Sequence, residues 1–289
     1  MPELPEVETV RLGLSPVMEG QVLTDVQTRR GDLRIPFPKD FVARTKGRKV
    51  KKLWRRAKYL LADLDSGETL VIHLGMSGRM SVYAHGKQRR IGNYVYDKAP
   101  DSVGKHDHVV FETDAPARII FNDHRRFGLM TLVNTEHLDQ DKLFKFIGVE
   151  PLSEKFNAAY LAKVLNGKKT PIKSALLDQR TIAGLGNIYV CEALFRSGIS
   201  PKRLAGSVKP ERLTLLAAAI KKVLKDAIAA GGSTLRDHAQ ATGDPGNFQH
   251  HFLAYGREGL ACKTAKCPGA VKRIVQSGRS TFYCPKCQS

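Results

Sequence analysis

The spacing of apolar residues divides the chain into a strand-rich first half and a helix-rich second half. Residues 5–14 repeat apolar side chains at helical intervals and predict a short helix, which Pro16 and Gly20 end. Between residues 21 and 133, short apolar runs alternate with turns of Gly, Pro and Asp, a pattern typical of a β-sandwich or barrel. The clearest runs are residues 69–74, 108–112, 118–121 and 129–133.

The second half of the chain shows helical spacing. Four helices are expected, over residues 156–166, 172–179, 188–197 and 211–230. Thr170 with Pro171 is predicted to begin the second helix, and Asn187 is predicted to cap the third. Two tight turns at 183–186 separate these two helices, and the exposed backbone amides at the second N-terminus suit a phosphate. Residues 270–283 resemble a β-hairpin in their pattern.

Two cysteine pairs near the end of the chain carry the strongest local signal. Four residues separate Cys262 from Cys267, two separate Cys284 from Cys287, and sixteen lie between the pairs. Thiolates at these spacings can surround one zinc ion, and so short a segment needs the metal because it cannot build its own core. A disulfide pair is the alternative. Cys191 shares a helix side with apolar residues and is expected in the core.

These patterns predict an α+β chain of several domains. A length of 289 residues is sufficient for more than one domain with an ample core. The expected order is an N-terminal β-sandwich with a leading helix at 1–133, a helix-two-turns-helix domain at 134–249 and a zinc-ribbon-like hairpin at 250–289.

Basic residues are concentrated in two segments. The net charge is +19; residues 29–58 hold thirteen Lys or Arg against two acids, and residues 257–289 hold seven against one. These segments therefore supply +17 of the +19. Charge gathered in this way favours a polyanion partner, and nucleic acid is favoured over a membrane because the sequence shows no basic amphipathic helix with an aromatic face.

A secreted or membrane-spanning protein is not expected. The hydrophobic content of 42% is ordinary for a globular protein, and the apolar stretches are too short to cross a bilayer. The first residues are acidic and lack the apolar segment of a signal peptide. We therefore expect a cytoplasmic protein whose thiols stay reduced.

The first six residues offer a nucleophile beside two acids. If Met1 is removed, Pro2 carries a secondary amine that titrates at about 7.7–8.0, so a sizeable fraction is neutral at physiological pH. Such an amine can attack an aldehyde-level carbon to form an iminium, with Glu3 and Glu6 as general acids or bases. The alternative is that Pro5 and Glu6 only begin a helix.

Several residues of the strand region suit a nucleic-acid interface. Lys58 follows a dense basic run, which by itself indicates a phosphate-binding or solvated lysine. Two glycines flank Met76 and predict a projecting loop, although methionine is usually a core residue. Arg125 and Phe127 share a turn after a strand, where an aromatic ring beside arginines can enter a base stack. His106 belongs to a His-x-His pattern that is weak as a metal site.

The order of these motifs resembles that of the formamidopyrimidine-DNA glycosylases, base-excision repair enzymes for oxidised purines. Met1–Thr9 is similar to the family's MPELPEVET start, and residues 55–61 to its RRAKYLL segment. HLGMSG, RRFG, GLGNIY and the cysteine pairs complete the resemblance over the whole chain. His124 stands where the family commonly has proline, and the four residues after Cys262 replace the two that it often has.

The resemblance implies a bifunctional glycosylase and lyase. Pro2 would attack C1′ of a flipped nucleotide and displace the base, and Glu3 would protonate the sugar ring oxygen. Lys58 would assist β-elimination, and Arg279 would assist δ-elimination. Supporting or DNA-binding roles are expected for Glu6, His73, Met76, His106, Arg125, Phe127, Lys168 and Asn187. We expect damaged double-stranded DNA as partner, a monomer, one structural Zn²⁺ and no soluble cofactor. The resemblance also implies a bacterial-type cytoplasmic protein that is associated with the nucleoid through DNA binding.

Two alternatives remain open on sequence grounds. One is an enzyme like endonuclease VIII, with the same chemistry on oxidised pyrimidines. Leu4-Pro5 and the set of Met76, Arg125 and Phe127 favour the purine enzyme instead. The other is a non-catalytic zinc protein that binds DNA, which the intact Pro2 and the other catalytic positions argue against.

The basic segments predict strongly salt-dependent DNA binding. Each neutralised phosphate should add roughly −0.9 to the slope of log affinity against log salt on duplex DNA. Lys168→Ala should weaken binding about equally for damaged and undamaged duplexes, because a phosphate contact reads no base. Titrations at several salt concentrations check both statements, and a slope near zero would mean that the basic segments do not contact DNA.

Overall fold

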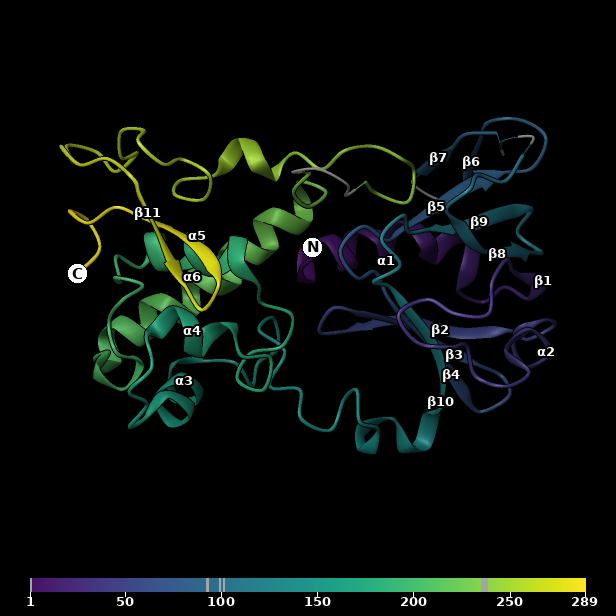
Figure 1. Cartoon of the computed structure of the whole chain (residues 1–289), viewed down its shortest axis with the longest axis horizontal. Coiled ribbons are helices and arrows are strands. Elements are labelled where there is room, and N and C mark those ends of the chain that lie inside the picture. The colour runs from purple at the N-terminus through teal and green to yellow at the C-terminus, as the bar shows by residue number, and fades with distance from the viewer. Residues whose placement is uncertain (1, 92–93, 99, 101, 235–238) are drawn as a thin grey trace. The chain divides into compact units, whose positions relative to one another are not determined.

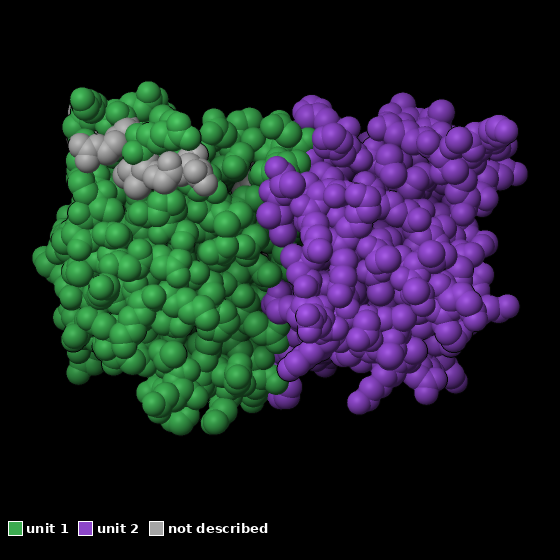
Figure 2. Space-filling view, turned by 180° about the vertical axis from the view of Figure 1, so that it is seen from behind, with its two compact units in different colours: residues 1–145, 230–247 green, residues 146–229, 248–289 purple. Residues whose placement is uncertain are grey.

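The computed structural model describes residues 2–91, 94–98, 100, 102–234 and 239–289 (Figure 1). The chain divides into two compact units, residues 1–145 with 230–247 and residues 146–229 with 248–289 (Figure 2). The domain limits expected from the sequence, at residues 133 and 249, stay predictions.

The first unit consists mainly of antiparallel strands. Its elements are α1 (Leu4–Met18), β1 (Leu23–Thr28), α2 (Phe41–Thr45), β2 (Val50–Arg56), β3 (Tyr59–Leu64), β4 (Glu68–His73), β5 (Arg79–Ala84), β6 (Arg89–Ile91), β7 (Tyr94–Tyr96), β8 (Asp107–Thr113), β9 (Ala117–Asn122), β10 (Leu129–Asn134) and η1 (Thr135–Gln140). One sheet has the order β1-β8-β9-β5 and the other the order β10-β4-β3-β2. The four strand runs predicted from apolar patterning correspond to β4, β8, β9 and β10.

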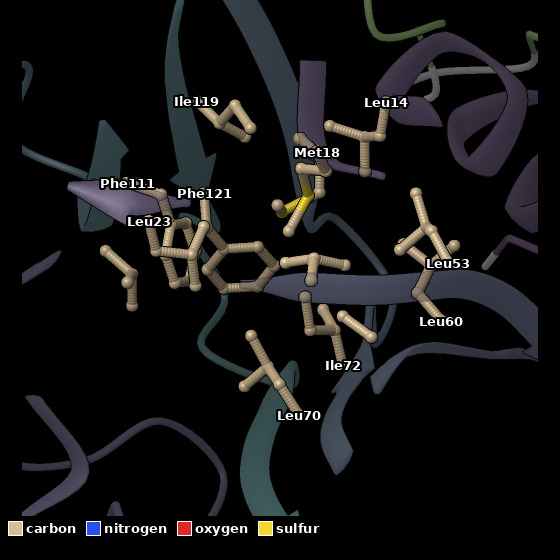
Figure 3. Packing of buried hydrophobic residues seen from close by; sticks show 14 of the residues in the cluster. Leu14, Met18, Leu23, Leu53, Leu60, Leu70, Ile72, Phe111, Ile119 and Phe121 are labelled. Carbon is tan, nitrogen blue, oxygen red and sulfur yellow. The ribbon is translucent and has the colours of Figure 1, made fainter. Parts of the chain in front are cut away.

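A single hydrophobic core lies between these two sheets. Phe111 and Phe121 enter it from one sheet, Leu60 and Ile72 from the other, and Met18 from α1 (Figure 3). The residues of this core alternate along β3, β4, β5, β8, β9 and β10, as a strand with one face on the core requires. In β1 and β2 the core residues are three positions apart, because the strand register shifts between them. The predicted β-sandwich with a leading helix is therefore confirmed.

Helix α1 is longer than its sequence predicts. The predicted end before Pro16 is wrong, because the helix continues through this residue to Met18. Val17 and Met18 are fully buried in the sandwich core, and their packing outweighs the hydrogen bond that a proline cannot donate. Gly13 is needed at its position, since a Cβ there would lie 2.6 Å from the Cβ of Ala241.

The second unit is helical and ends in a two-stranded sheet. Its elements are α3 (Ala158–Leu165), α4 (Ile172–Leu177), α5 (Asn187–Arg196), η2 (Ala205–Ser207), α6 (Pro210–Ala229), η3 (Phe248–His251), β11 (Lys272–Gln276) and β12 (Arg279–Tyr283). The helix-two-turns-helix pattern is α4, the turns that follow it and α5. Cys191 is buried on α5, as the sequence predicts. Among the described residues, no helix combines the length and apolar character needed to cross a membrane.

Two predicted helix caps are wrong by one residue. Pro171 itself is the N-cap of α4, because its extended ψ of 141° lies outside the helix. Gly186 is the N-cap of α5, and Asn187 is the first helical residue. The Asn187 side chain does not cap its own helix, since its Nδ2 donates to the carbonyl oxygen of Ser280, 2.9 Å away. A long-range hydrogen bond therefore replaces the local one that the sequence suggests.

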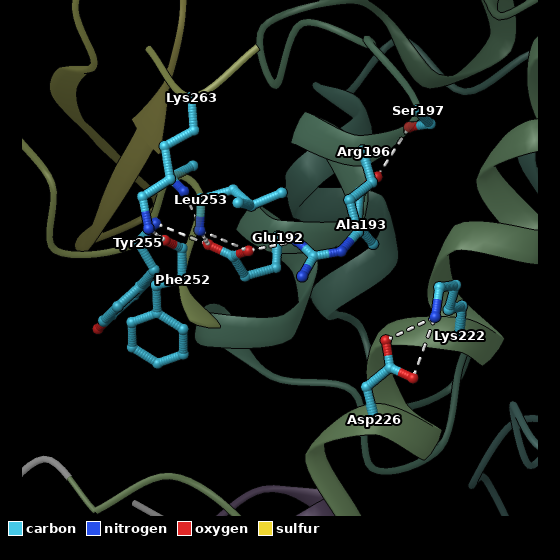
Figure 4. A network of polar contacts seen from close by, with 11 residues as sticks. Glu192, Ala193, Arg196, Ser197, Lys222, Asp226, Phe252, Leu253, Tyr255 and Lys263 are labelled. Atoms are coloured by element: carbon cyan, nitrogen blue, oxygen red, sulfur yellow. Dashed lines mark hydrogen bonds and ion pairs between the residues drawn. The ribbon is translucent and has the colours of Figure 1, made fainter. Parts of the chain in front are cut away.

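A fully buried carboxylate on α5 anchors the segment before the cysteine pairs. Both oxygens of Glu192 accept from the backbone N–H of Leu253, and Oε1 also accepts from Ala254 and Tyr255 at 2.9 Å (Figure 4). Arg196, one turn further along α5, pairs with Oε2 at 2.5 Å. Because a buried carboxylate is destabilising unless it is hydrogen-bonded, this network fixes the path of the chain into the cysteine-rich segment.

Candidate active site and zinc site

The amino-terminal segment is folded into the first unit by a reciprocal pair of carboxylates. Glu3 and Glu6 form a capping box at the start of α1, and Oε2 of Glu6 accepts from the Glu3 N–H at 2.9 Å. Oε1 of Glu6 accepts from the backbone N–H of Ser233 at 2.8 Å. Pro2, Glu3 and Glu6 are all buried. Pro2, the predicted nucleophile, therefore directly precedes the buried carboxyl of Glu3. The hydrogen bonds of Glu6 fix the backbone position of this segment.

Lys58 occupies the tight turn between β2 and β3. Ala57 supplies the left-handed residue of that turn, with a φ of 53°. The Arg55 side chain donates to the Ala57 carbonyl oxygen at 2.8 Å, and its Nε donates to the Glu8 carboxylate of α1 at 3.0 Å. Lys58 is only 7% exposed, so its ammonium is held by the fold and is not a solvated surface charge. Helix α1 thus anchors both the Pro2 segment and the turn that carries Lys58.

His73, at the end of β4, is a neutral, half-buried imidazole. Its Nδ1 accepts from the backbone N–H of Gly75 at 3.0 Å, so the ring proton is on Nε2. Burial, reinforced by the positive charges of Lys58 and Arg34, lowers its pKa to about 4. The ring therefore supports the loop that follows β4 and does not carry a positive charge at neutral pH.

The structure brings the two predicted DNA-penetrating loops together. Met76 is 38% exposed and Phe127 is 46% exposed, so both large apolar side chains reach solvent from their loops. The Arg125 guanidinium lies over the Phe127 ring, 4.9 Å from its centre. Ser77 of the first loop donates to Asp123 at the base of the second. Sequence reasoning missed Asp123, although an acid between an apolar strand and a basic turn is a signal worth weighing.

His106 lies beside these loops. Its ring is half-buried and meets the rings of His108 and His124 edge-on, at centroid distances of 6.4 Å and 6.3 Å. His108 is buried and its Nε2 makes a hydrogen bond to the Asp123 carbonyl oxygen at 2.8 Å. The DNA contact predicted for His106 stays a prediction, as does the effect of His124 on its loop.

In the second unit, the predicted Arg279 begins β12 and is exposed. Its neighbour Ser280 is held by two side chains, because the Ser280 carbonyl oxygen accepts from Asn187 and from Nζ of the fully buried Lys173 at 3.1 Å. Lys173 also donates to Oγ1 of Thr281 at 2.7 Å. Sequence reasoning missed Lys173, because a lysine on a short helix gives no sign that it is buried. The side-chain donor of Asn187 serves this hairpin, and the predicted phosphate contacts of Asn187 and Lys168 stay predictions.

The four predicted cysteines converge on one point. Their sulfur atoms all lie within 4.8 Å of one another, and all five cysteines of the chain are free thiols. Sγ of Cys262 and Cys287 are 3.7 Å apart, and those of Cys267 and Cys284 are 3.8 Å apart. A zinc–sulfur bond of about 2.3 Å gives a tetrahedral edge of about 3.8 Å, which matches. The cluster therefore fits one structural zinc, and the four-residue spacing of the first pair does not prevent it.

Zinc binding is expected at one ion per chain. Cys284→Ser should lose the metal, because one of four ligands is removed, and the hairpin that carries Arg279 should lose its order. Cys191→Ser is the matched control and should keep its zinc, since this thiol lies in the α5 core. Metal analysis of freshly purified proteins measures both, and parent protein without stoichiometric zinc would contradict the site.

The lowered pKa of the half-buried His73 predicts a stability loss on acidification. In the unfolded chain an imidazole titrates near 6.5, so between about pH 6.5 and 4 the unfolded state binds more protons and the folded state loses stability. The neutral His73 side chain contributes its full share of the folding stability above about pH 6.5. Between pH 6.5 and 4 this share, about 3 kcal/mol, is lost. His73→Gln should flatten the pH dependence of the unfolding free energy in urea, measured against the parent. Parallel curves for the two proteins would show that His73 is not held neutral by the fold.

Three family models match most of the chain. Residues 1–130 match the formamidopyrimidine-DNA glycosylase N-terminal domain, and residues 147–239 match the H2TH domain of the same enzymes. Residues 265–289 match the zinc finger found in FPG and IleRS. The last match begins after Cys262, so this ligand is assigned from the sulfur geometry.

Full-length relatives and solved structures agree with these matches. Proteins named formamidopyrimidine-DNA glycosylase are 56% identical over 288 residues in Dinoroseobacter shibae and 54% identical over 294 residues in a Bradyrhizobium species, with 100% of both chains covered. The MutM (Fpg) protein of Thermus thermophilus is 38% identical, with a TM-score of 0.82 over 99% of this chain and 98% of that one. A Lactococcus lactis Fpg variant, solved with DNA containing Fapy-dG, is 30% identical, with a TM-score of 0.86 over 100% of both chains. The chain belongs to the formamidopyrimidine-DNA glycosylase family.

Proposed function

We propose that the protein is a bifunctional base-excision repair enzyme that removes oxidised purines, such as 8-oxoguanine and formamidopyrimidines, from duplex DNA and then cleaves the strand. The observation that carries this proposal is the buried amino-terminal segment, in which Pro2 immediately precedes the buried carboxyl of Glu3. An amine activated beside an acid in a protected site is what imine chemistry at a sugar carbon requires.

The reaction begins at C1′ of the damaged nucleotide. The lone pair of the neutral Pro2 nitrogen forms a bond to C1′, and the bond from C1′ to the base breaks. The base leaves with that electron pair and takes up the proton that the nitrogen releases. Glu3 gives a proton to the ring oxygen, which opens the sugar and leaves an iminium between Pro2 and C1′. The burial of both residues limits the access of water to this intermediate.

The iminium makes the subsequent strand cleavage feasible. Its positive charge acidifies the C2′ hydrogen, so loss of that proton expels the 3′ phosphate in β-elimination. A second elimination expels the 5′ phosphate. Lys58, held in the turn after β2, assists the first step, and Arg279, held at the start of β12, assists the second. Zinc takes no part in these steps, because four cysteine ligands leave it no open position.

The proposed partner is damaged double-stranded DNA, bound by a monomer. Solved relatives include Lactococcus lactis Fpg in complexes with Fapy-dG DNA and with abasic-site DNA. His106, Arg125, Lys168 and Asn187 are the proposed contacts to the DNA backbone and the opposite base. Met76 and Phe127 fill the space that the flipped nucleotide leaves, because extrusion of a base costs a few kcal/mol of stacking. A cytoplasmic location follows from this substrate in a bacterial cell and from the zinc-binding thiols.

Borohydride reduction should trap a covalent adduct between the protein and 8-oxoguanine duplex, and peptide mapping should assign the adduct to residue 2. A protein with a retained or added residue before Pro2 is the matched control, because its proline nitrogen is then an amide and cannot attack. An adduct on Lys58 would overturn the assignment of the nucleophile. Absence of any adduct, with the base still excised, would indicate a glycosylase that uses water instead.

A further inference from the structure

Asp123 is a fully buried acid that no step of the proposed mechanism uses. It follows β9 directly, and its exposed fraction is 0%. Oδ1 accepts from the Ser77 hydroxyl at 2.6 Å and from the Arg125 N–H at 3.3 Å, and Oδ2 accepts from the Gly128 N–H at 2.7 Å. One carboxylate therefore holds both ends of the turn that carries Phe127 and reaches across to the neighbouring loop.

The main chain of the same residue continues the network into the sheet. The Asp123 N–H donates to the His106 carbonyl oxygen at 3.0 Å, and the Asp123 carbonyl oxygen pairs with His108 Nε2 at 2.8 Å. Its position is thus fixed from the β8 side independently of the two loops. A carboxylate in this setting acts as a rigid support, because charge-assisted hydrogen bonds to a buried group are strong and leave little freedom.

The two loops also touch through their backbones. A Cβ on Gly75 would lie 2.4 Å from the carbonyl carbon of Phe127 and 2.5 Å from the nitrogen of Gly128. A Cβ on Gly128 would lie 2.6 Å from Cζ of Phe121 and 3.0 Å from Oδ2 of Asp123. No space remains between the loops, so one cannot move far without the other. The Gly75 N–H, bonded to His73, ties this contact to β4.

From this geometry we infer that Asp123 and Ser77 are positioning residues for lesion extrusion. Their hydrogen bond joins the Met76 loop and the Arg125–Phe127 loop into one rigid wedge, so the three side chains enter the duplex together. Loops that are ordered in advance avoid the entropy that separate loops would lose on binding. The inference rests on the proposed function, specifically on the roles of Met76, Arg125 and Phe127 in filling the vacated stack.

The test compares two substrates with the full-length, zinc-bound protein. One duplex contains 8-oxoguanine opposite cytosine, and the other contains a ready-made abasic site, where less must be unstacked. Ser77→Ala removes the bond between the loops. Single-turnover excision of 8-oxoguanine should fall about tenfold, as expected for the loss of one hydrogen bond to a charged group. Cleavage of the abasic site should change by less than about twofold, because the chemistry at Pro2 is intact.

Asp123→Asn is the second variant. The amide oxygen can still accept from Ser77 and Arg125, but the amide turns an N–H toward the Gly128 N–H, so the Phe127 turn loses its attachment at Gly128. Excision should fall further than in Ser77→Ala, again with abasic-site cleavage largely kept. Thr45→Val is the matched control, since it removes another fully buried hydroxyl of the same unit, which donates to Phe41, and should leave both rates unchanged. Thermal unfolding and zinc content are measured for every variant.

The outcomes separate this inference from the function on which it rests. If Ser77→Ala lowers both rates equally, or lowers neither while Phe127→Ala slows excision, the inference is overturned and the proposed function stands. If Phe127→Ala excises 8-oxoguanine at the parent rate, the wedge role itself fails. If the parent protein excises no 8-oxoguanine, the proposed function fails before the loops are in question. Selective loss of excision in Ser77→Ala supports the rigid wedge even if Asp123→Asn does not fold.

Discussion

Buried carboxylates that must find hydrogen-bond donors hold the functional segments of this protein in position. Glu6, Asp123 and Glu192 are each at most 2% exposed, and each accepts from backbone N–H groups of a segment that lacks regular structure. A buried carboxylate without hydrogen-bond donors would lower the stability of the fold by several kcal/mol. Displacing any of these segments is therefore unfavourable, because it removes donors from such a carboxylate. The same requirement thus anchors the amino-terminal segment, the Phe127 turn and the chain before the cysteine cluster.

In the second unit, a buried lysine makes a comparable set of hydrogen bonds. Lys173 is fully buried and donates to Ser280 and Thr281, and Asn187 donates to the same Ser280 carbonyl oxygen. The start of β12 is therefore held by α4 and α5 as well as by the cysteine cluster. A hairpin this small has too little core to orient an arginine, so a metal and two donors from neighbouring helices supply the order that the proposed role of Arg279 needs.

In the first unit, Lys58 carries a positive charge while the nearby His73 side chain is neutral. Burial, and after it the charge of Lys58 at the turn after β2, lowers the pKa of His73 to about 4 and keeps its ring neutral. A neutral imidazole can accept from Gly75 and support the Met76 loop without competing with the lysine for an anion. His73 therefore supports the loop that follows β4, while the role proposed for Lys58 in strand cleavage needs the positive charge that this lysine carries.

The sequence by itself determined the sandwich, the helix-two-turns-helix unit, the cysteine cluster and the family, because alternation, helical spacing and cysteine spacing are local signals. It also predicted that Met76 and Phe127 project, from glycines and a turn. The tertiary structure alone decided that α1 passes through Pro16, that Asn187 bonds to Ser280 instead of capping, and that Asp123 and Lys173 are buried supports. These outcomes depend on partners between about 45 and 110 residues away in the chain or on packing against two sheets. Local propensity has no information about such partners, and the free energy of burying and satisfying a polar group is larger than the local preferences it overrides.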